Sequence, residues 1–165
     1  MIKKCHFGQL NSCCYHKGFY NDKDYETSLQ TVKYSDFFIN HEDDEFPYHT
    51  AWDLFSGSCY CFAVSLHKVL KYNVYIIEGS NKKSFHAFCQ VYKNNKLYYV
   101  DARGMTTCFN EFLEGVKLFV NGELVIRKIS DEYICNEKAD EHDEEGLKFS
   151  EEVIKKYKDY YKFED

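Results

Sequence analysis

The chain has little proline and little glycine, and it lacks any long apolar run. One proline and eight glycines among 165 residues exclude collagen-like and low-complexity chains. No stretch approaches the length needed to span a bilayer, and residues 1–6 are not followed by the apolar segment of a signal peptide. We therefore expect no membrane association and a cytoplasmic location.

An excess of positive charge is also missing. The chain carries 27 acidic and 21 basic residues, for a net charge of −6, so it has no general attraction to phosphate backbones or anionic lipid. We expect no nucleic-acid partner. Hydrophobic residues make up 44% and aromatic residues 18% of the chain, far more than in disordered chains. The length fits one domain with one core.

Cysteine is abundant, with eight residues. The chain is large enough to form its own core and shows no export signal, so we expect reduced thiols rather than four disulfides. A cluster near the N-terminus has residue types that bind metals, although its spacing fits no common zinc motif. We favour incidental cysteines there and expect no metal or cofactor, with a metal-binding module as a minor alternative. The cluster consists of Cys5, His6, Cys13, Cys14 and His16.

Residues 58–101 show the clearest pattern of helix and strands. After Ser58, a natural N-cap, apolar residues recur at spacings of three and four, which predicts a helix ending at Asn73. Short apolar runs bounded by turn residues then predict three strands. The strands are Val74–Ile77, Phe85–Tyr92 and Lys96–Asp101, and a hairpin turn at Asn94–Asn95 joins the last two.

Further elements follow this helix and its strands. Thr106 or Thr107 begins a short predicted helix that Gly115 ends. Asn121–Gly122 predicts a second hairpin, between strands at 118–120 and 124–126. One long helix followed by two hairpins predicts an α+β fold with an antiparallel sheet.

We divide this single domain into three segments. Residues 1–50 form an N-terminal extension packed on the core, residues 51–135 the catalytic core, and residues 136–165 an acidic linker and a C-terminal helix. β-branched and aromatic residues predict an extended segment at Thr31–Ile39.

The C-terminal segment has two parts. Residues 136–145 are almost all charged and predict a solvated linker. Apolar residues at helical spacing then predict a helix from Ser150 to Phe163. We favour packing of this helix on the domain over binding of a partner.

Two cysteines, Cys59 and Cys61, lie at the start of the long predicted helix. Cys59 precedes Phe62 by three residues and Leu66 by seven, so it shares the apolar face that we expect against the sheet. Cys61 is in register with Ser65, on the polar face. The first helical turn provides N–H groups and a positive dipole end, which favour a thiolate and can stabilise an oxyanion. We therefore select Cys59 as the candidate nucleophile.

The hairpin brings a histidine and an aspartate together. If Asn94 and Asn95 form a two-residue turn, Phe88 faces Asp101 across the hairpin. Because strand side chains alternate, His86 lies on the face of Phe88 and is the diagonal neighbour of Asp101, at about 7–8 Å. We expect Asp101 to orient His86 and His86 to take the proton of Cys59.

Each of these residues also has a simpler interpretation. Cys59 is then a small helix-start residue, His86 a core histidine bonded to backbone, and Asp101 a cap on the turn that follows it. Their occurrence together, in the order cysteine, histidine, aspartate and on compatible faces, favours a catalytic triad.

These motifs resemble those of the papain-like and transglutaminase-like cysteine enzyme superfamily. Residues 57–63, Gly-Ser-Cys-Tyr-Cys-Phe-Ala, are similar to the papain signature Gly-Ser-Cys-Trp-x-Phe-Ser/Ala. His86-Ala87-Phe88 followed by Asp101 resembles the transglutaminase-like core, in which a His-Ala-Trp-type strand leads to an aspartate on the next strand. The resemblance implies a core in which the nucleophile-bearing helix packs on an antiparallel sheet. It also implies that Cys59 is the nucleophile, His86 the base and Asp101 the orienting carboxylate.

The chain departs from this superfamily at one functional position. Papain-like peptidases place a glutamine six residues before the nucleophile as an oxyanion donor. Here that position is Asp53, which can only accept hydrogen bonds when ionised. The Trp52 indole N–H or a backbone amide is the alternative donor. The interval between Cys59 and His86 is shorter than in papain and resembles that of the compact transglutaminase-like branch.

Two functions follow as hypotheses. The first is a cysteine-dependent acyl-transfer enzyme, either a peptidase, an amidase, a deamidase or a transglutaminase-like enzyme, acting on a protein, peptide or amide through a thioester. The second is a catalytically inactive member of the same fold that binds or inhibits a protein partner. Fold similarity does not choose between them.

Overall fold

The computed structural model describes residues 14–38, 50–80, 84–129 and 143–164. Its centre is a six-stranded sheet in which every neighbouring pair of strands is antiparallel, in the order β1-β5-β4-β3-β2-β6. This confirms the α+β class. The strands are β1 (His16–Lys17), β2 (Asn73–Glu78), β3 (Phe85–Lys93), β4 (Lys96–Asp101), β5 (Gly104–Thr106) and β6 (Val125–Lys128).

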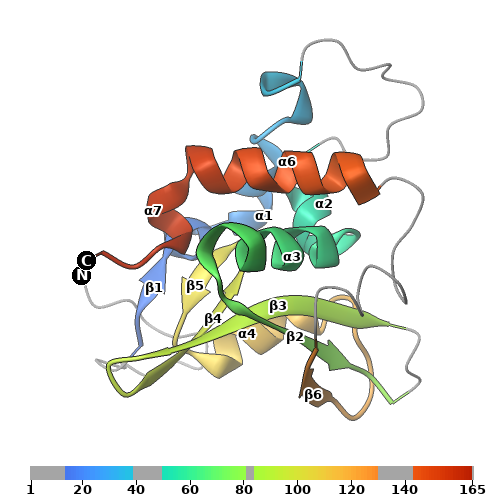
Figure 1. Ribbon diagram of the computed structural model, residues 1–165. Helices are drawn as coiled ribbons and strands as arrows, with labels where there is room; N and C mark the ends of the chain where they lie inside the picture. Colours follow the sequence, from blue (N-terminus) through green and yellow to red (C-terminus); the bar gives the residue numbers. More distant parts are fainter. Residues whose placement is uncertain (1–13, 39–49, 81–83, 130–142, 165) are drawn as a thin grey trace.

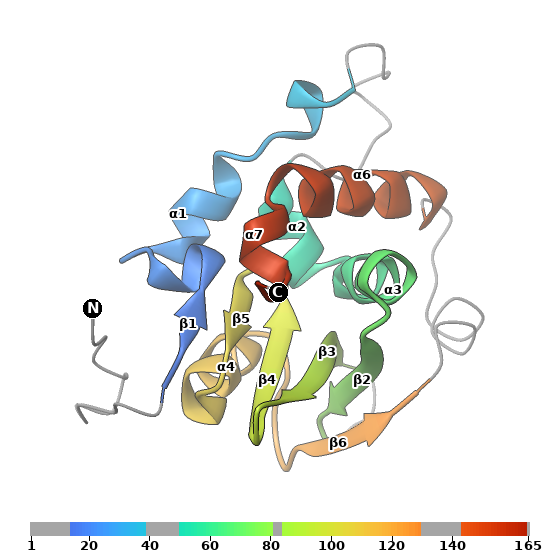
Figure 2. The ribbon, with the colours of Figure 1, turned by 60° about the vertical axis from the view of Figure 1, so that its left-hand side comes forward.

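Helices cover both faces of this sheet, as Figures 1 and 2 show. The long helix α3 lies on one face with α6 above it, and α4 packs on the opposite face through Phe112 and Val116. The helices in the described ranges are α1 (Tyr25–Gln30), α2 (Ala51–Ser56), α3 (Cys59–Leu70), α4 (Phe109–Val116), α6 (Asp143–Lys156) and α7 (Lys158–Tyr161), with the 3-10 turns η1 (Gly18–Asn21) and η2 (Tyr34–Asp36). None of these helices has the length and apolar character needed to cross a membrane.

The predicted start of α3 is confirmed, whereas Asn73, the predicted end, is the first residue of β2. Ser58 occupies the N-cap position, although its side chain makes no capping bond, and the helix ends at Lys71 in the left-handed conformation. The predicted polar face is wrong, because Cys61 and Ser65 are buried. The Ser65 hydroxyl donates to the Leu147 carbonyl of α6 at 3.4 Å. The second layer of helix, rather than solvent, therefore covers this side of α3.

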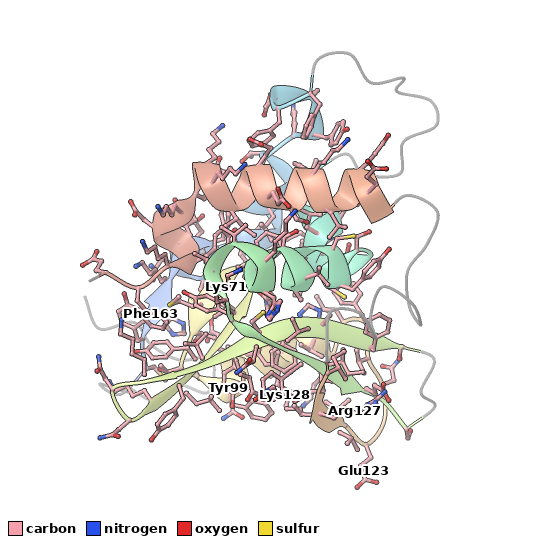
Figure 3. All side chains as sticks on the ribbon, viewed as in Figure 1. Lys71, Tyr99, Glu123, Arg127, Lys128 and Phe163 are labelled. Carbon is pink, nitrogen blue, oxygen red and sulfur yellow. The ribbon has the colours of Figure 1, made fainter. Side chains whose placement is uncertain are left out.

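The hairpin between β3 and β4 has the predicted register. Lys93 pairs with Lys96, and the pairing runs to Cys89 opposite Val100. Asn94 and Asn95 have φ values of 54° and 61°, as a two-residue turn of type I′ requires. Side chains of alternating residues consequently point to opposite faces of the sheet. Tyr99, for example, belongs to the face away from α3 (Figure 3).

The second predicted hairpin is wrong. Leu118–Val120 form no strand, and Val125–Lys128 pair with β2 instead. Asn121 and Gly122 therefore belong to a loop that leads from α4 to the edge of the sheet. In the described part of the sheet, β2 pairs with β3 along one edge, and β6 pairs with its other edge.

Three other boundaries differ from the predictions. Residues 31–38 contain η2 and one isolated bridge, Lys33 to Thr50, rather than a strand. The C-terminal helix begins at Asp143, inside the predicted linker, and is broken at Tyr157. Gly115 lies within α4, which continues to Val116. The remaining linker residues, 136–142, lie outside the described ranges.

Gly104, which follows the tight turn between β4 and β5, is the glycine with the strictest local requirement. Its φ is +117°, and an added Cβ would overlap the Lys17 carbonyl oxygen. We expect Gly104→Ala to lower the free energy of unfolding by about 1–3 kcal/mol, measured by urea denaturation. Gly57→Ala is the control, because its nearest neighbour would be the Asp53 carbonyl oxygen at 3.9 Å. Equal unfolding midpoints for the two variants would contradict the prediction.

Candidate active site

Cys59 is the first residue of α3, and its side chain lies against the beginning of β3. The backbone N–H of Ala87 donates to the Cys59 sulfur at 3.3 Å. The pairing of β3 with β4 ends two residues further along, at Cys89. The sulfur therefore accepts a strand N–H where the ladder stops. Only 4% of Cys59 is exposed.

His86 lies next to Cys59, on the opposite face of β3 from Ala87. Its Nε2 is 3.0 Å from Oδ2 of Asp101, and Phe55 and Phe112 pack against its ring at 5.2 and 5.9 Å between ring centroids. Burial lowers the pKa of His86, but hydrogen bonds to Asp101 and Cys59 and the charges of both outweigh burial and raise this pKa above its ordinary value. The surroundings thus favour an imidazolium.

Asp101 ends β4 and is 2% exposed. Its Oδ1 accepts the backbone N–H of Arg103 at 2.9 Å, so it also caps the turn, as its simpler interpretation predicts. Burial raises the pKa of Asp101, but the Arg103 charge and hydrogen bonds from His86 and Arg103 hold it well below its usual range. The carboxylate is therefore ionised, and it contacts both the backbone of the turn and the imidazole.

The three predicted site residues come together in one chain of contacts. The Cys59 sulfur bonds to His86, and His86 bonds to Asp101. Since Nε2 of His86 is engaged by Asp101, Nδ1 is the ring nitrogen that remains for Cys59. A thiol, an imidazole and a carboxylate in this order can form a thiolate–imidazolium pair and perform nucleophilic and acid–base steps.

The region before α3 shows what Asp53 does. Its Oδ2 accepts the backbone N–H of Thr50 at 3.1 Å, within the capping box of α2. The side chain at the position of the papain glutamine is thus a helix cap. Trp52 packs on Phe55 and Phe119, with centroid distances of 5.2 and 6.2 Å. The backbone N–H of Cys59 belongs to the first turn of α3, where amides have no partner within the helix.

Arg103 was not among the residues that the sequence singled out. It is fully buried beside the triad and bonds to Asp101 through its Nε and Nη2. The signal that could have located it is an arginine two residues after the aspartate in a tight turn, where the side chain can fold back onto the carboxylate.

The N-terminal cluster of residue types that bind metals, for which we favour incidental cysteines, is only partly described. Cys5, His6 and Cys13 lie outside the described ranges. His16 is a strand residue whose Nδ1 is 2.9 Å from the Thr106 hydroxyl. Among described residues there is no group of three or more metal-binding side chains. The five described cysteines, Cys14, Cys59, Cys61, Cys89 and Cys108, are thiols rather than disulfides.

The chain was compared with protein families, curated proteins and solved structures, and no match was found.

Proposed function

We propose that this protein is a cysteine-dependent acyl-transfer enzyme that acts on protein, peptide or amide substrates. The observation that supports this most strongly is the convergence of Cys59, His86 and Asp101 from α3, β3 and β4 in one hydrogen-bonded chain. The topology, with a nucleophile at the start of a helix on an antiparallel sheet, is the one that the resemblance to papain-like and transglutaminase-like enzymes implies.

The reaction begins with the Cys59 thiolate attacking the carbonyl carbon of the acyl donor. The tetrahedral oxyanion is stabilised by the backbone N–H of Cys59 at the helix start. As the carbon–nitrogen bond breaks, the His86 imidazolium gives its proton to the leaving amine, and a thioester remains on Cys59. Water or an acceptor amine then attacks the thioester, His86 takes the proton of this nucleophile, and the thiolate is released. Asp101 holds the imidazole throughout.

A second candidate function is a non-catalytic protein-binding or inhibitory module of the same fold. Two observations favour it. The Asp53 carboxylate stands in the position of the expected oxyanion donor and is engaged in a helix cap. Cys59 and His86 are only 4% and 1% exposed, so a substrate has to displace covering groups to reach the sulfur.

Alkylation by iodoacetamide separates the two functions. In the active enzyme, Cys59 should be alkylated at pH 7 faster than Cys61 and Cys89, because only Cys59 pairs with an imidazolium and the thiolate is the nucleophile. Burial raises the pKa of Cys89 well above its ordinary value, so Cys89 is an internal control. The measurement is the labelling rate of each cysteine peptide by mass spectrometry.

The same experiment with His86→Ala tests the base. We expect the rate at Cys59 to fall by about tenfold or more, because the thiolate loses its counter-ion. If Cys59 in the native protein reacts no faster than Cys61, the enzyme is ruled out and the inactive module becomes the better interpretation.

A further inference from the structure

Arg103 is the most deeply buried charge near the triad. Its exposed fraction is 0%, and it lies in the turn between β4 and β5, where its carbonyl accepts the backbone N–H of Tyr20 at 3.0 Å. The chain has 21 basic residues, of which two are arginine. In a chain that uses lysine almost everywhere, an arginine at the buried position indicates a need for its planar, multi-donor geometry.

The guanidinium contacts both oxygens of the Asp101 carboxylate. Its Nη2 bonds to Oδ2 at 2.7 Å, and its Nε lies 3.1 and 3.2 Å from Oδ1 and Oδ2. Nη2 also donates to the Phe112 carbonyl at 3.1 Å. Oδ2 is therefore shared between Arg103 and His86, and rotation of the carboxylate breaks both contacts.

Aromatic rings surround the guanidinium and fix it in place. The Cζ atom lies 4.4, 4.8, 5.4 and 5.5 Å from the ring centroids of Phe55, Tyr20, Phe112 and Tyr25. Phe55 and Phe112 also contact the ring of His86. Two rings thus contact both the guanidinium and the imidazole, which couples their positions through packing as well as through Asp101.

We infer that Arg103 is a positioning residue of this site: it keeps Oδ2 of Asp101 aligned with His86, and its charge limits how strongly the carboxylate holds the imidazolium proton. This inference rests on the proposed acyl-transfer function. Without the guanidinium, an uncompensated carboxylate would bind the proton more tightly and His86 would be a poorer acid towards the leaving amine.

The other titratable groups around Arg103, Asp101 and His86 come from several elements. Cys59 bonds to His86, and the others interact electrostatically with members of the cluster or with each other. Burial raises the pKa values of Tyr20, Tyr161 and Cys89 well above their ordinary values, so these three are neutral near pH 7. The groups are Cys59 of α3, Tyr20 of η1, Tyr25 of α1, Cys89 of β3, Glu111 of α4 and Tyr161 of α7.

Two substitutions of Arg103 separate charge from geometry. Arg103→Met removes the charge, and we expect the pKa of His86, measured by NMR of the imidazole C–H signals, to rise by about one unit. Arg103→Lys keeps the charge but loses the planar contact, so the pKa of His86 should change less. In the lysine variant, misalignment should instead lower the iodoacetamide rate at Cys59 by about tenfold at pH 7.

Gly115→Ala perturbs the guanidinium without altering Arg103 itself. An added Cβ would overlap Nη1 of Arg103 and approach the Tyr25 hydroxyl to 2.9 Å. We expect it to slow alkylation of Cys59 as Arg103→Lys does. Arg127→Met is the matched control, because Arg127 lies on the edge strand β6 (Figure 3) and pairs with Glu78 of β2 at 2.7 Å rather than with Asp101.

The outcomes distinguish this inference from the proposed function. The inference is overturned if every folded Arg103 variant and Gly115→Ala match Arg127→Met within about twofold in rate and leave the titration of His86 unchanged. If Arg103→Met does not fold, Arg103→Lys and Gly115→Ala decide by the same criteria. Failure of the native protein to alkylate selectively at Cys59 contradicts the proposed function, whereas the His86 titration still reports on Arg103.

Discussion

Cys59→Ala is expected to remove acyl transfer, with a loss of about three orders of magnitude or more in the rate of acylation. The sulfur of Cys59 is the only one that bonds to His86 among the described cysteines. The measurement is the release of nitrophenolate from 4-nitrophenyl acetate, with the acetylated peptide located by mass spectrometry. An alanine at residue 59 has no atom that can form the thioester, so no acyl group can be carried at this position.

Cys61→Ala is the matched control for this prediction. Cys61 lies two residues further along α3 and is also buried. On the helix it lies one turn before Ser65, whose hydroxyl bonds to the Leu147 carbonyl of α6. The control should therefore acylate within about twofold of the native rate. Equal loss in both variants, with native circular dichroism, would show that Cys59 has no special role.

The local pattern of the sequence was enough to predict the hairpin that carries His86 and Asp101. The turn at Asn94–Asn95 fixes the register, because only residues that tolerate positive φ fit a two-residue turn of this type. Once the register is fixed, side-chain alternation brings His86 beside Asp101, which the 3.0 Å contact confirms. The choice of Cys59 rests on helical spacing, which is equally local.

Long-range packing could not be predicted in the same way. Helix spacing places Cys61 and Ser65 opposite the sheet, but it does not show that α6, some 80 residues later in the chain, covers them. For the same reason Asn121–Gly122, a typical hairpin signal, does not show that β6 pairs with β2. The strand β1 has two residues, too short for any periodic pattern.

Asp101→Asn is expected to cause the largest loss of stability, about 3–5 kcal/mol in the free energy of unfolding, because it leaves the buried Arg103 without a counter-charge. Glu78→Gln is the matched control. It breaks a pair of the same type, but the Arg127 side chain is 44% exposed, so we expect a loss of about 1 kcal/mol or less. Urea denaturation at pH 6 measures both. A loss for Asp101→Asn no greater than for Glu78→Gln contradicts the prediction.

The double variant Asp101→Asn/Arg103→Met tests the cause of this loss. Removing both charges leaves no unpaired ion in the core, so the double variant should be more stable than the sum of the single losses predicts, by about 2 kcal/mol. Additive losses would mean that the pair acts through packing rather than through charge.

The pH dependence of the stability lost in Asp101→Asn gives an independent check that the loss is caused by charge. The folded state holds the pKa of Asp101 well below its usual range, so its stabilisation is present above the unfolded pKa of about 3.9 and is lost as the pH falls below it. The pKa of His86 is raised in the folded state, so its contribution is present below about pH 6.5 and is lost as the pH rises through the folded pKa. The asparagine variant loses the first contribution and the part of the second that Asp101 provides. The stability difference between the native protein and Asp101→Asn should therefore be largest between about pH 4 and pH 6.5 and decrease on either side. A difference that does not vary with pH would show that Asp101 stabilises the fold through its shape alone.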